Sequence, residues 1–285
     1  MPSRDEPILL ATGLSWPESP RWRNGALWLS DVHNFRLARV DMDGSVETVC
    51  AVEGRPSGMD FSAEGHLLMA TALGRQLLDI SVPDGVQRPM ADLGSLTKAY
   101  LNDLVTSADG WSWVGDTGFV FGVAEPRRCG SLIGWHPLHG ARIVAADIFF
   151  PNGMAITPDG STLYLAETFG KCISAFDIGR DGSLDNRRLH AELPGSPDGL
   201  CLDAEGCLWV ALLFEGRFVR LSPQGKEIDR IDFPGKSAIA CIIGDDDKST
   251  LFLCVSRIDK SDPANIVRHG EIHRMRAPAA AAGRP

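Results

Sequence analysis

This sequence of 285 residues has no long apolar run, few aromatic residues and fewer basic than acidic residues. No run approaches the roughly 18 apolar residues of a membrane-spanning helix, which argues against a membrane protein. The first residues, MPSRDEPILLATG, lack a basic region followed by a long apolar stretch, so we expect no secretory signal. Lys and Arg number 28 against 37 Asp and Glu, a net charge of −9 that argues against binding to nucleic acid or to an anionic membrane surface.

Paired cysteines are also missing. The seven cysteines are an odd number and include no CxxC pair. Four of them lie within alternating apolar runs, where a free cysteine acts as a small core residue: Cys172, Cys201, Cys241 and Cys254. These features predict reduced thiols in a cytoplasmic protein and argue against a disulfide framework or a zinc site.

Helical periodicity is nearly absent, whereas turn residues are abundant, with 30 Gly and 18 Pro. One phrase recurs along the chain: a small or polar residue, an alternating apolar run, a turn at Gly or Asp, and a second alternating run. Its six copies are ESPRWRNGALWLSD, SGMDFSAEGHLLMAT, NDLVTSADGWSWVGD, NGMAITPDGSTLYLAE, DGLCLDAEGCLWVAL and SAIACIIGDDDKSTLFLCVS. Each copy predicts a β-hairpin.

The length of the repeat indicates the architecture. Successive turn glycines are 40, 45, 50 and 46 residues apart: Gly25, Gly65, Gly110, Gly160 and Gly206. The last copy has its turn at Asp245–Asp247. This period is too long for ankyrin or leucine-rich repeats and fits a four-stranded propeller blade. We therefore predict an all-β fold, a six-bladed β-propeller with four antiparallel strands per blade, as a single domain spanning residues 1–276.

The ends of the chain should close the propeller, because an open ring leaves an unpaired sheet edge. The sixth copy ends in a strand around Glu271–Met275, with no fourth strand after it. The apolar segment Pro7–Leu14 precedes the first blade, and we expect it to supply the missing outer strand. The low-complexity tail APAAAAGRP, residues 277–285, is predicted to be disordered.

Equivalent positions of the repeat should meet near the axis, because the first strand of each blade lines the central channel. One equivalent position lies eight residues before the turn glycine, or seven before it in the shorter first repeat; in the last repeat it is located approximately. A polar residue stands there in every copy: Glu18, Ser57, Asn102, Asn152, Asp198 and Ser237. The channel mouth should therefore contain two carboxylates and two carboxamides, with two hydroxyls opposite.

Oxygen donors without His or Cys suit Ca²⁺, Mg²⁺ or Mn²⁺ better than a soft-ligand zinc site. Each Asn-Asp, Asn-Gly or Asp-Gly pair could instead be a turn pair that caps the start of a strand. The common register of four acidic or amide groups around one axis favours a metal site over this alternative.

Four motifs of the sequence resemble those of the senescence-marker protein/regucalcin/gluconolactonase/luciferin-regenerating enzyme family. They are WPESPRW (16–22), NDLVTSADG (102–110), FPNGMAITPDG (150–160) and SPDGLCLDAEGCLWVA (196–211). The resemblance extends over all six repeats in order. It implies a six-bladed propeller with one divalent metal ion on the channel axis, Ca²⁺ being our first choice and Zn²⁺, Mn²⁺ or Mg²⁺ the alternatives.

Position by position, the resemblance implies that Glu18, Asn152 and Asp198 bind the metal. It further implies that Asn102 lies near metal and substrate and that Asp198 is the general base. This chemistry is coherent, because a divalent ion can polarise a carbonyl oxygen while an adjacent carboxylate accepts a proton from the attacking water. No GxSxG elbow, HExxH helix or Gly-rich phosphate loop offers a competing site.

The sequence departs from the sugar-lactone members of this family just before Asn102. Those members commonly have Arg-Pro where this chain has Tyr100 and Leu101, and Gly where it has Leu104. A phenol offers one hydroxyl and a stacking face in place of the fork of donors of an Arg. This favours a substrate less polar than a sugar lactone, although Tyr100 could equally pack within a loop.

Several loop residues near the mouth are further candidates for substrate binding: Trp16, His33, Phe119 and Phe121, with Phe35, Asp116 and Phe169 beside them. His33 could be a second acid or base, or an ordinary solvated loop histidine. Phe119 and Phe121 belong to a long insertion in the third blade, which could form a lid or a pocket wall.

These observations predict a metal-dependent hydrolase that opens a small-molecule lactone or related ester. The same site could support another metal-assisted reaction, since one site can serve several chemistries. A non-catalytic calcium-binding or interaction propeller is the alternative outside enzymes. The convergent carboxylates favour the enzyme, because a scaffold does not need them. The oligomeric state stays open.

Overall fold

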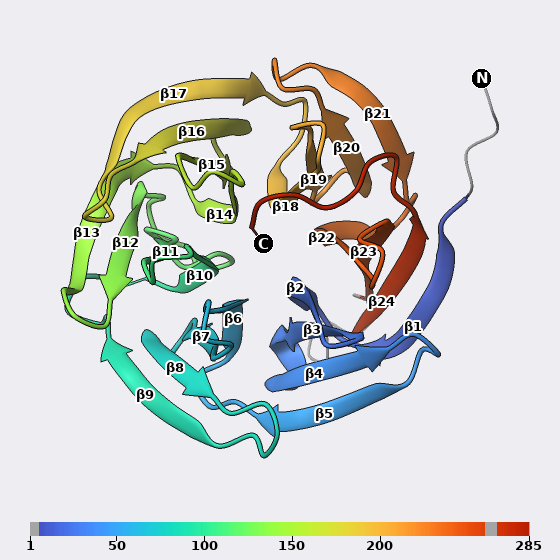
Figure 1. The fold of residues 1–285 in the computed structure, drawn as a ribbon, viewed down its shortest axis with the longest axis horizontal. Helices are drawn as coiled ribbons and strands as arrows, with labels where there is room; N and C mark the ends of the chain where they lie inside the picture. Colours follow the sequence, from blue (N-terminus) through green and yellow to red (C-terminus); the bar gives the residue numbers. More distant parts are fainter. Residues whose placement is uncertain (1–5, 98, 260–266, 285) are drawn as a thin grey trace.

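The computed structural model describes residues 6–97, 99–259 and 267–284. Its strands form six four-stranded antiparallel sheets that follow one another around a single axis (Figure 1). The helical content of these residues is one short 3-10 turn, η1 (Val32–Asn34). The predicted all-β, six-bladed propeller is therefore confirmed.

The first blade contains β2 (Pro17–Arg23), β3 (Ala26–Asp31), β4 (Arg36–Asp41) and β5 (Val46–Ala51). The second contains β6 (Pro56–Phe61), β7 (Leu67–Thr71), β8 (Gln76–Ile80) and β9 (Gln87–Asp92). The third contains β10 (Leu101–Thr106), β11 (Ser112–Asp116), β12 (Gly130–His136) and β13 (Gly140–Ile148). The fourth contains β14 (Pro151–Ile156), β15 (Thr162–Glu167), β16 (Cys172–Ile178) and β17 (Leu184–Glu192). The fifth contains β18 (Pro197–Leu202), β19 (Leu208–Leu212), β20 (Arg217–Leu221) and β21 (Glu227–Asp232). The sixth contains β22 (Ser237–Gly244), β23 (Thr250–Asp259), β24 (Val267–Arg276) and β1 (Ile8–Leu14). The strands β2, β6, β10, β14, β18 and β22 lie nearest the axis and are called the inner strands (Figure 1).

Strand β1 closes the ring as predicted. It pairs antiparallel with β24, from Ile8 opposite Arg274 to Leu14 opposite Gly270. The last sheet therefore has the order β1-β24-β23-β22, and Figure 1 shows the N-terminal strand at the outer edge of this blade. Residues separated by almost the whole chain are thus joined in one sheet.

The five turn glycines of the repeat lie between the first and second strands of their blades. All five have φ angles between 71° and 93°, a region that residues with a Cβ disfavour. Asp245 takes the same conformation in the sixth blade, at φ 78°. The need for positive φ at each hairpin tip explains why glycine spacing reveals the blades.

Other glycines allow neighbouring inner strands to approach each other. Each inner strand is bulged close to its second residue, where the pairing register shifts. In β14 and β18 the next residue is glycine: a Cβ on Gly153 would lie 2.5 Å from the carbonyl oxygen of Asp198, and one on Gly199 would lie 2.5 Å from the Cβ of Ala240. The Asn-Gly and Asp-Gly pairs therefore reflect contact between strands and not turns that cap them.

The core is apolar and lies between the sheets. Its largest fully buried side chains include Trp113, Trp209, Phe176, Phe218 and Phe252. All seven cysteines are free; four are buried, Cys50 and Cys172 are half-buried, and Cys129 is exposed. Among the described residues, no helix has the length and apolar character needed to cross a membrane.

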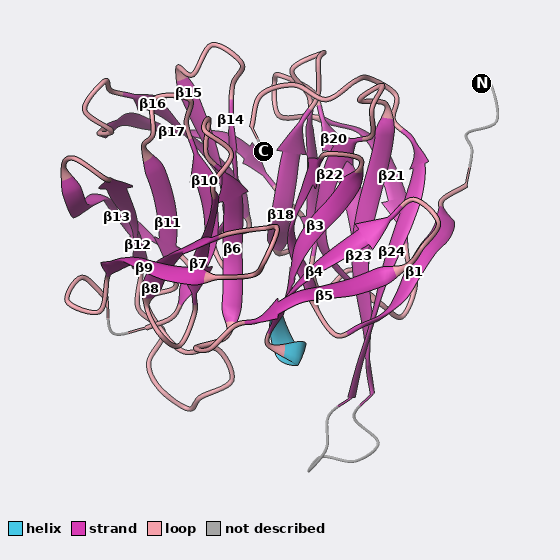
Figure 2. Ribbon diagram, turned by 60° about the horizontal axis from the view of Figure 1, so that its bottom comes forward, coloured by secondary structure: helices cyan, strands magenta, loops and turns pink. Residues whose placement is uncertain are grey.

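The C-terminal tail crosses the end of the axis opposite the starts of the inner strands (Figures 1 and 2). The sequence predicts disorder from residue 277, whereas the structure has residues 277–284 hydrogen-bonded to three blades. Ala281 N donates to Lys248 O at 2.9 Å and Ala282 N to Leu202 O at 3.1 Å, while Ile156 and Arg284 exchange both backbone bonds. Residues 1–5 and Pro285 lie outside the described residues.

This difference has a physical reason, because the tail is held mainly by its backbone. Its alanines contribute little packing, and the hydrogen bonds go to carbonyl and amide groups at the ends of inner strands. Gly283 is needed for the contact: its φ is +72°, and a Cβ there would lie 2.2 Å from Ile156 O. Such pairing leaves no hydrophobic pattern in the sequence.

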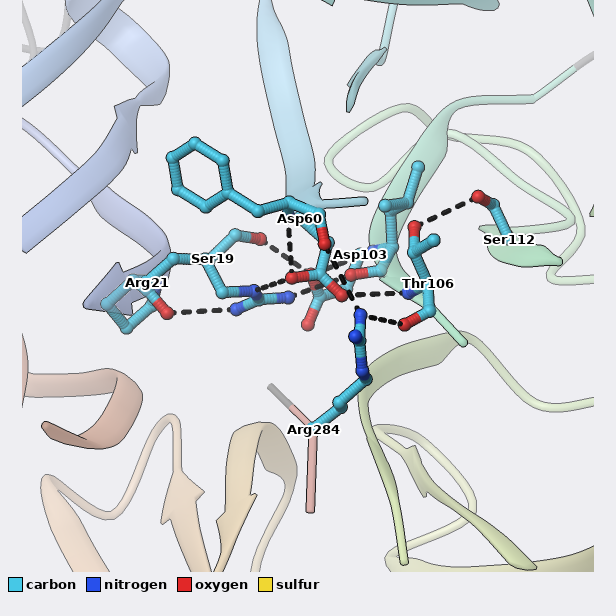
Figure 3. Close-up of polar contacts among 10 residues, drawn as sticks. Ser19, Arg21, Asp60, Asp103, Thr106, Ser112 and Arg284 are labelled. Atoms are coloured by element: carbon cyan, nitrogen blue, oxygen red, sulfur yellow. Dashed lines mark hydrogen bonds and ion pairs between the residues drawn. The ribbon is translucent and has the colours of Figure 1, made fainter. Parts of the chain in front are cut away.

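Arg284 extends the contacts of the tail to the second and third blades. Its Nη1 donates to Thr106 O at 3.0 Å and to Phe61 O at 3.4 Å. Figure 3 shows this guanidinium beside the buried ion pair of Arg21 and Asp60, whose Nε and Oδ1 are 3.1 Å apart. Asp60 also accepts from the backbone N–H of Phe61 and Thr106, each at 2.8 Å. The tail and this network together connect all six blades.

Removing the tail tests whether these contacts stabilise the ring. We expect deletion of residues 278–285 to lower the melting temperature by about 5 °C, because several backbone hydrogen bonds and those of Arg284 are lost. Arg284→Gln should cause a smaller decrease. The measurement is thermal unfolding followed by circular dichroism, and an unchanged melting temperature after the deletion would show that the tail contributes nothing.

Candidate functional site

The polar residues predicted to share one position of the repeat do share it in the structure. The second residue of each inner strand is, in blade order, Glu18, Ser57, Asn102, Asn152, Asp198 and Ala238. These residues lie at the face of the propeller where the inner strands begin, which we call the site face. Ser237 is the first residue of β22, opposite Ser256, so the predicted second hydroxyl is replaced by the methyl group of Ala238.

Two carboxylates of this set are close enough to repel each other. Asp198 is 2% exposed, while Glu18 keeps partial exposure toward the site face. Burial raises the pKa of Glu18 well above its usual value, and the charges of Asp198 and Asp103 raise it further. Burial and Asp103 also raise the pKa of Asp198 well above its usual value. Without a cation, the site therefore favours protonated carboxyl groups.

Asp103 is the third buried carboxyl group in this region, and hydrogen bonds hold it. Its Oδ1 accepts from Ser19 Oγ at 2.6 Å and from the backbone N–H of Leu104 at 2.8 Å. Burial still raises its pKa, although Arg21 opposes this effect. Figure 3 shows Asp103 beside Asp60 and the Arg21 guanidinium, so it links the site to this network.

Two buried oxygen atoms of the site have no hydrogen-bond partner: Asn152 Oδ1 and Asp198 Oδ1. The amide nitrogen of Asn152 donates to Thr168 Oγ1 at 3.1 Å, which fixes the direction of its free oxygen. An unsatisfied buried acceptor costs roughly 1–3 kcal/mol, so two of them beside Glu18 need a further partner. Carboxylate and amide oxygens are the donors that Ca²⁺, Mg²⁺ and Mn²⁺ prefer, and these three residues fit such an ion.

This donor set differs from a typical transition-metal centre. Among the described residues, no three His, Cys, Asp or Glu side chains form a metal-binding group. The candidate set has only two carboxylates, and its third donor is the amide of Asn152. Asn102, the other predicted amide, is partly exposed and donates from Nδ2 to Pro151 O at 3.1 Å, which orients it at the boundary of the third and fourth blades.

Trp16 precedes the first inner strand and positions Glu18. Its indole Nε1 donates to Glu18 Oε1 at 3.3 Å. The ring of His33, on η1, meets that of Trp16 edge-on with centroids 6.2 Å apart. Burial and the nearby Arg268 and Arg55 lower the pKa of His33 to about 4. The imidazole is therefore neutral at pH 7 and stays so at mildly acidic pH, where an ordinary solvated histidine becomes protonated.

Asp116, another predicted mouth residue, serves a structural role. Its Oδ1 accepts from Thr97 Oγ1 and from Gly118 N, and its Oδ2 from Ser131 Oγ at 3.3 Å. It ends the second strand of its blade, as Asp31 and Glu167 do in theirs, and those two also accept backbone N–H groups from the loop before an inner strand. Carboxylates satisfied in this way anchor loops and have no free oxygen for chemistry.

The residue directly before each inner strand forms a second ring of equivalent positions, which we call the rim: Trp16, Arg55, Tyr100, Phe150, Ser196 and Lys236. Of these six residues, Trp16 and Tyr100 were predicted from the sequence and the other four were not. Tyr100 does not pack alone, because the guanidinium carbon of Arg55 lies 4.5 Å above the centre of its ring. A comparison of the residues before successive β-hairpins could have revealed this ring.

Phenylalanines from three blades gather on the site face. Phe119 is buried and contacts Phe149, Phe150 and Phe169, with ring centroids 5.2–6.5 Å apart. Phe121 is 54% exposed and lies against Phe169 and Phe214. The insertion of the third blade thus forms an apolar wall. Phe119 supports this wall from the buried side, and Phe121 is exposed on its surface. Phe149, Phe150 and Phe214 were not predicted.

The unpaired carboxylates should destabilise the protein when no metal is bound. Because their pKa values are raised in the folded state, the folded protein holds protons more tightly than the unfolded chain, and its stability falls as the pH rises above about 4. We expect Glu18→Gln and Asp198→Asn to melt about 2 °C or more above the parent protein at pH 8 with a chelator. Both variants should lose any stabilisation by Ca²⁺.

Asp60→Asn is the matched control for this measurement. Asp60 is also buried, but Arg21 neutralises it, so its replacement should lower the melting temperature. If the parent protein with chelator melts above both site variants, the two carboxylates do not repel each other as described.

Metal binding should release protons, because the raised pKa values leave Glu18 or Asp198 partly protonated in the free protein and a metal requires the ionised forms. We expect the affinity for Ca²⁺ to increase with pH. Calorimetric titration in two buffers of different ionisation enthalpy measures the number of protons released. Equal heats in the two buffers would contradict the raised pKa values.

Comparisons with known proteins agree with this fold. The structure of a luciferin-regenerating enzyme superposes with a TM-score of 0.80 at 20% identity, covering 97% of this chain and 99% of that one. A gluconolactonase of Xanthomonas campestris superposes with a TM-score of 0.74 at 25% identity, covering 93% and 89% of the two chains.

Sequence comparisons extend the likeness. A 6-deoxy-6-sulfogluconolactonase of Pseudomonas putida is 30% identical over 251 residues, which are 86% of this chain and 84% of that protein. Human regucalcin is 31% identical over 150 residues, about half of each chain. Residues 16–257 match the family described as "SMP-30/Gluconolactonase/LRE-like region". This chain belongs to that family.

Proposed function

We propose that this protein is a divalent-metal-dependent hydrolase that opens a lactone or related ester at the site face. The observation that carries the proposal is the pair of unpartnered buried oxygens of Asn152 and Asp198 beside the carboxylate of Glu18. Family membership and a relative named as a lactonase support the reaction class.

Glu18, Asn152 and Asp198 are the proposed ligands, with Ca²⁺ as the first choice and Mg²⁺, Mn²⁺ or Zn²⁺ as alternatives. When bound, a divalent cation would polarise the ester carbonyl and offset the negative charge that develops on its oxygen. It would also keep Glu18 and Asp198 ionised. Trp16 holds Glu18 through its indole N–H.

Asp198 is the proposed general base. Its carboxylate accepts a proton from water as the water oxygen attacks the carbonyl carbon. The ring C–O bond then breaks, and the leaving oxygen takes a proton to give a hydroxy acid. Asn102 lies at the adjacent position of the ring and is proposed to contact the substrate.

The site face favours a substrate with an apolar part. Phe121, Phe169 and Phe214 provide an aromatic surface on one side. Trp16, Tyr100 and His33 are the proposed contacts on the other side, and the neutral imidazole of His33 suits hydrogen bonding. Phe119 supports this surface from within the core.

A panel of sugar, aliphatic and aromatic lactones tests the proposal. We expect turnover with Ca²⁺ or another divalent ion, loss of turnover with chelator, and a decrease in kcat of about a hundredfold or more for Asp198→Ala. Glu18→Gln should lose activity together with metal affinity. Turnover that persists with chelator and in both variants would overturn the mechanism.

A matched control is Asp116→Asn, whose carboxylate holds a loop and has no free oxygen; it should retain metal binding. Tight binding of one metal without turnover of any lactone would instead favour a non-catalytic calcium-binding propeller.

A further inference from the structure

Two arginines on the site face have no carboxylate partner among the described residues. Arg55 is the rim residue of the second blade, directly before Pro56. Its φ angle is 64°, an uncommon backbone conformation for a residue with a long side chain. Its Nε is buried and has no hydrogen-bond partner, and its guanidinium lies over the ring of Tyr100. A strained backbone and an unsatisfied donor indicate a group held in place for a ligand.

Arg268 is brought to the same region by the register of the sixth blade. It pairs with Ile258 near the outer end of the β23–β24 hairpin, which extends beyond the site face in Figure 2. Side chains alternate along a strand, so Arg268 shares a face with the buried Gly270 and Ile272. Gly270 packs against Ser15 and Pro17, which directs this face of β24 toward the first blade.

The two guanidinium groups lie near each other and near His33. Each lowers the pKa of the His33 imidazole, and the charge of Arg268 lowers the pKa of Arg55. His33 contacts Trp16, which donates to Glu18. The charges of the two arginines thus act on a residue that contacts Trp16, the hydrogen-bond donor to Glu18.

Three other cations on this face are neutralised by carboxylates. Lys236, the rim residue of the sixth blade, pairs with Glu271 at 2.5 Å. Arg36 pairs with Asp31 at 2.9 Å, and Arg187 with Glu167 at 2.6 Å. Arg55 and Arg268 are half-buried and repel each other, an arrangement that an anion between them would stabilise.

We propose that Arg55 and Arg268 bind an anionic substituent of the substrate, a carboxylate or a sulfonate, while the lactone ring reaches toward Glu18 and Asp198. This proposal rests on the proposed lactonase function and names the substrate class of the same site. Tyr100 does not make this side of the site apolar, because the Arg55 guanidinium lies on it. The substrate is then an anion at one end, with its apolar part near Phe121.

The test compares lactones that differ chiefly in the charge of one substituent. The probes are 5-oxotetrahydrofuran-3-carboxylate, the corresponding 3-sulfonate, and the neutral methyl ester of the carboxylate. We expect kcat/KM to be higher for an anion than for the ester, chiefly through a lower KM. Arg55→Gln and Arg268→Gln should each reduce this preference about ten- to a hundredfold. Opening of the lactone ring of the neutral methyl ester should change less than threefold. The carboxylate and sulfonate arms show which anion the site prefers.

Lys236→Gln is the matched control, because it removes a rim cation that already has a partner; the anion preference should persist. Arg55→Lys keeps the charge without the fork of donors and should recover part of the preference. A preference that survives in both Arg→Gln variants would overturn the proposal, as would equal kcat/KM for anion and ester in the parent protein.

A binding measurement separates this proposal from the proposed function. Tetrahydrofuran-3-carboxylate has no ester to hydrolyse, so calorimetry with this probe reports on the anion site even if no lactone is turned over. Binding that weakens about tenfold or more in Arg55→Gln and Arg268→Gln, and not in Lys236→Gln, supports the site. Absence of binding to the parent protein, or equal binding to all variants, would overturn it.

Discussion

Mutual repulsion among buried carboxylates is the constraint on which the site face depends. Glu18, Asp103 and Asp198 lie near the axis, and burial raises the pKa of each. Asp103 is relieved by Ser19 and Arg21, and Asp60 farther along the axis has its own guanidinium. The pair nearest the site face, Glu18 and Asp198, has no cationic partner among the described residues. The fold thus supplies internal cations where charge is structural and withholds them where a ligand can approach.

The backbone makes this concentration of charge possible. Neighbouring inner strands approach so closely that Gly153 and Gly199 have no room for a Cβ, and this approach brings Asn152 and Asp198 side by side on adjacent strands. Around them, carboxylates at the ends of second strands hold the loops that carry rim residues. The polar site is therefore fixed by elements that recur in several blades, whereas the apolar wall also depends on the insertion of the third blade.

Features that repeat were predictable from the sequence, and those that occur once were not. The turn glycines and alternating runs predict the six blades, and the common register predicts that Glu18, Asn102, Asn152 and Asp198 occupy one ring. Ser237 is misplaced by one residue, because the sixth turn has no glycine from which to count. The role of Arg55 was not predictable, because it depends on Tyr100 and Arg268, which are 45 and 213 residues away in sequence. The tail escapes notice because its contacts are made by backbone atoms.

The pairing of the first strand with the last has a consequence for synthesis of the protein. Strand β1 leaves the ribosome early, yet its partner β24 ends only at Arg276, and the tail follows it. Hairpins within a blade can form as they emerge, since their contacts are local. The circle itself can be completed only once nearly the whole chain has been translated. Until then β1 has no partner strand, and an arrested or truncated chain that lacks β24 exposes the edge of β1 to other molecules.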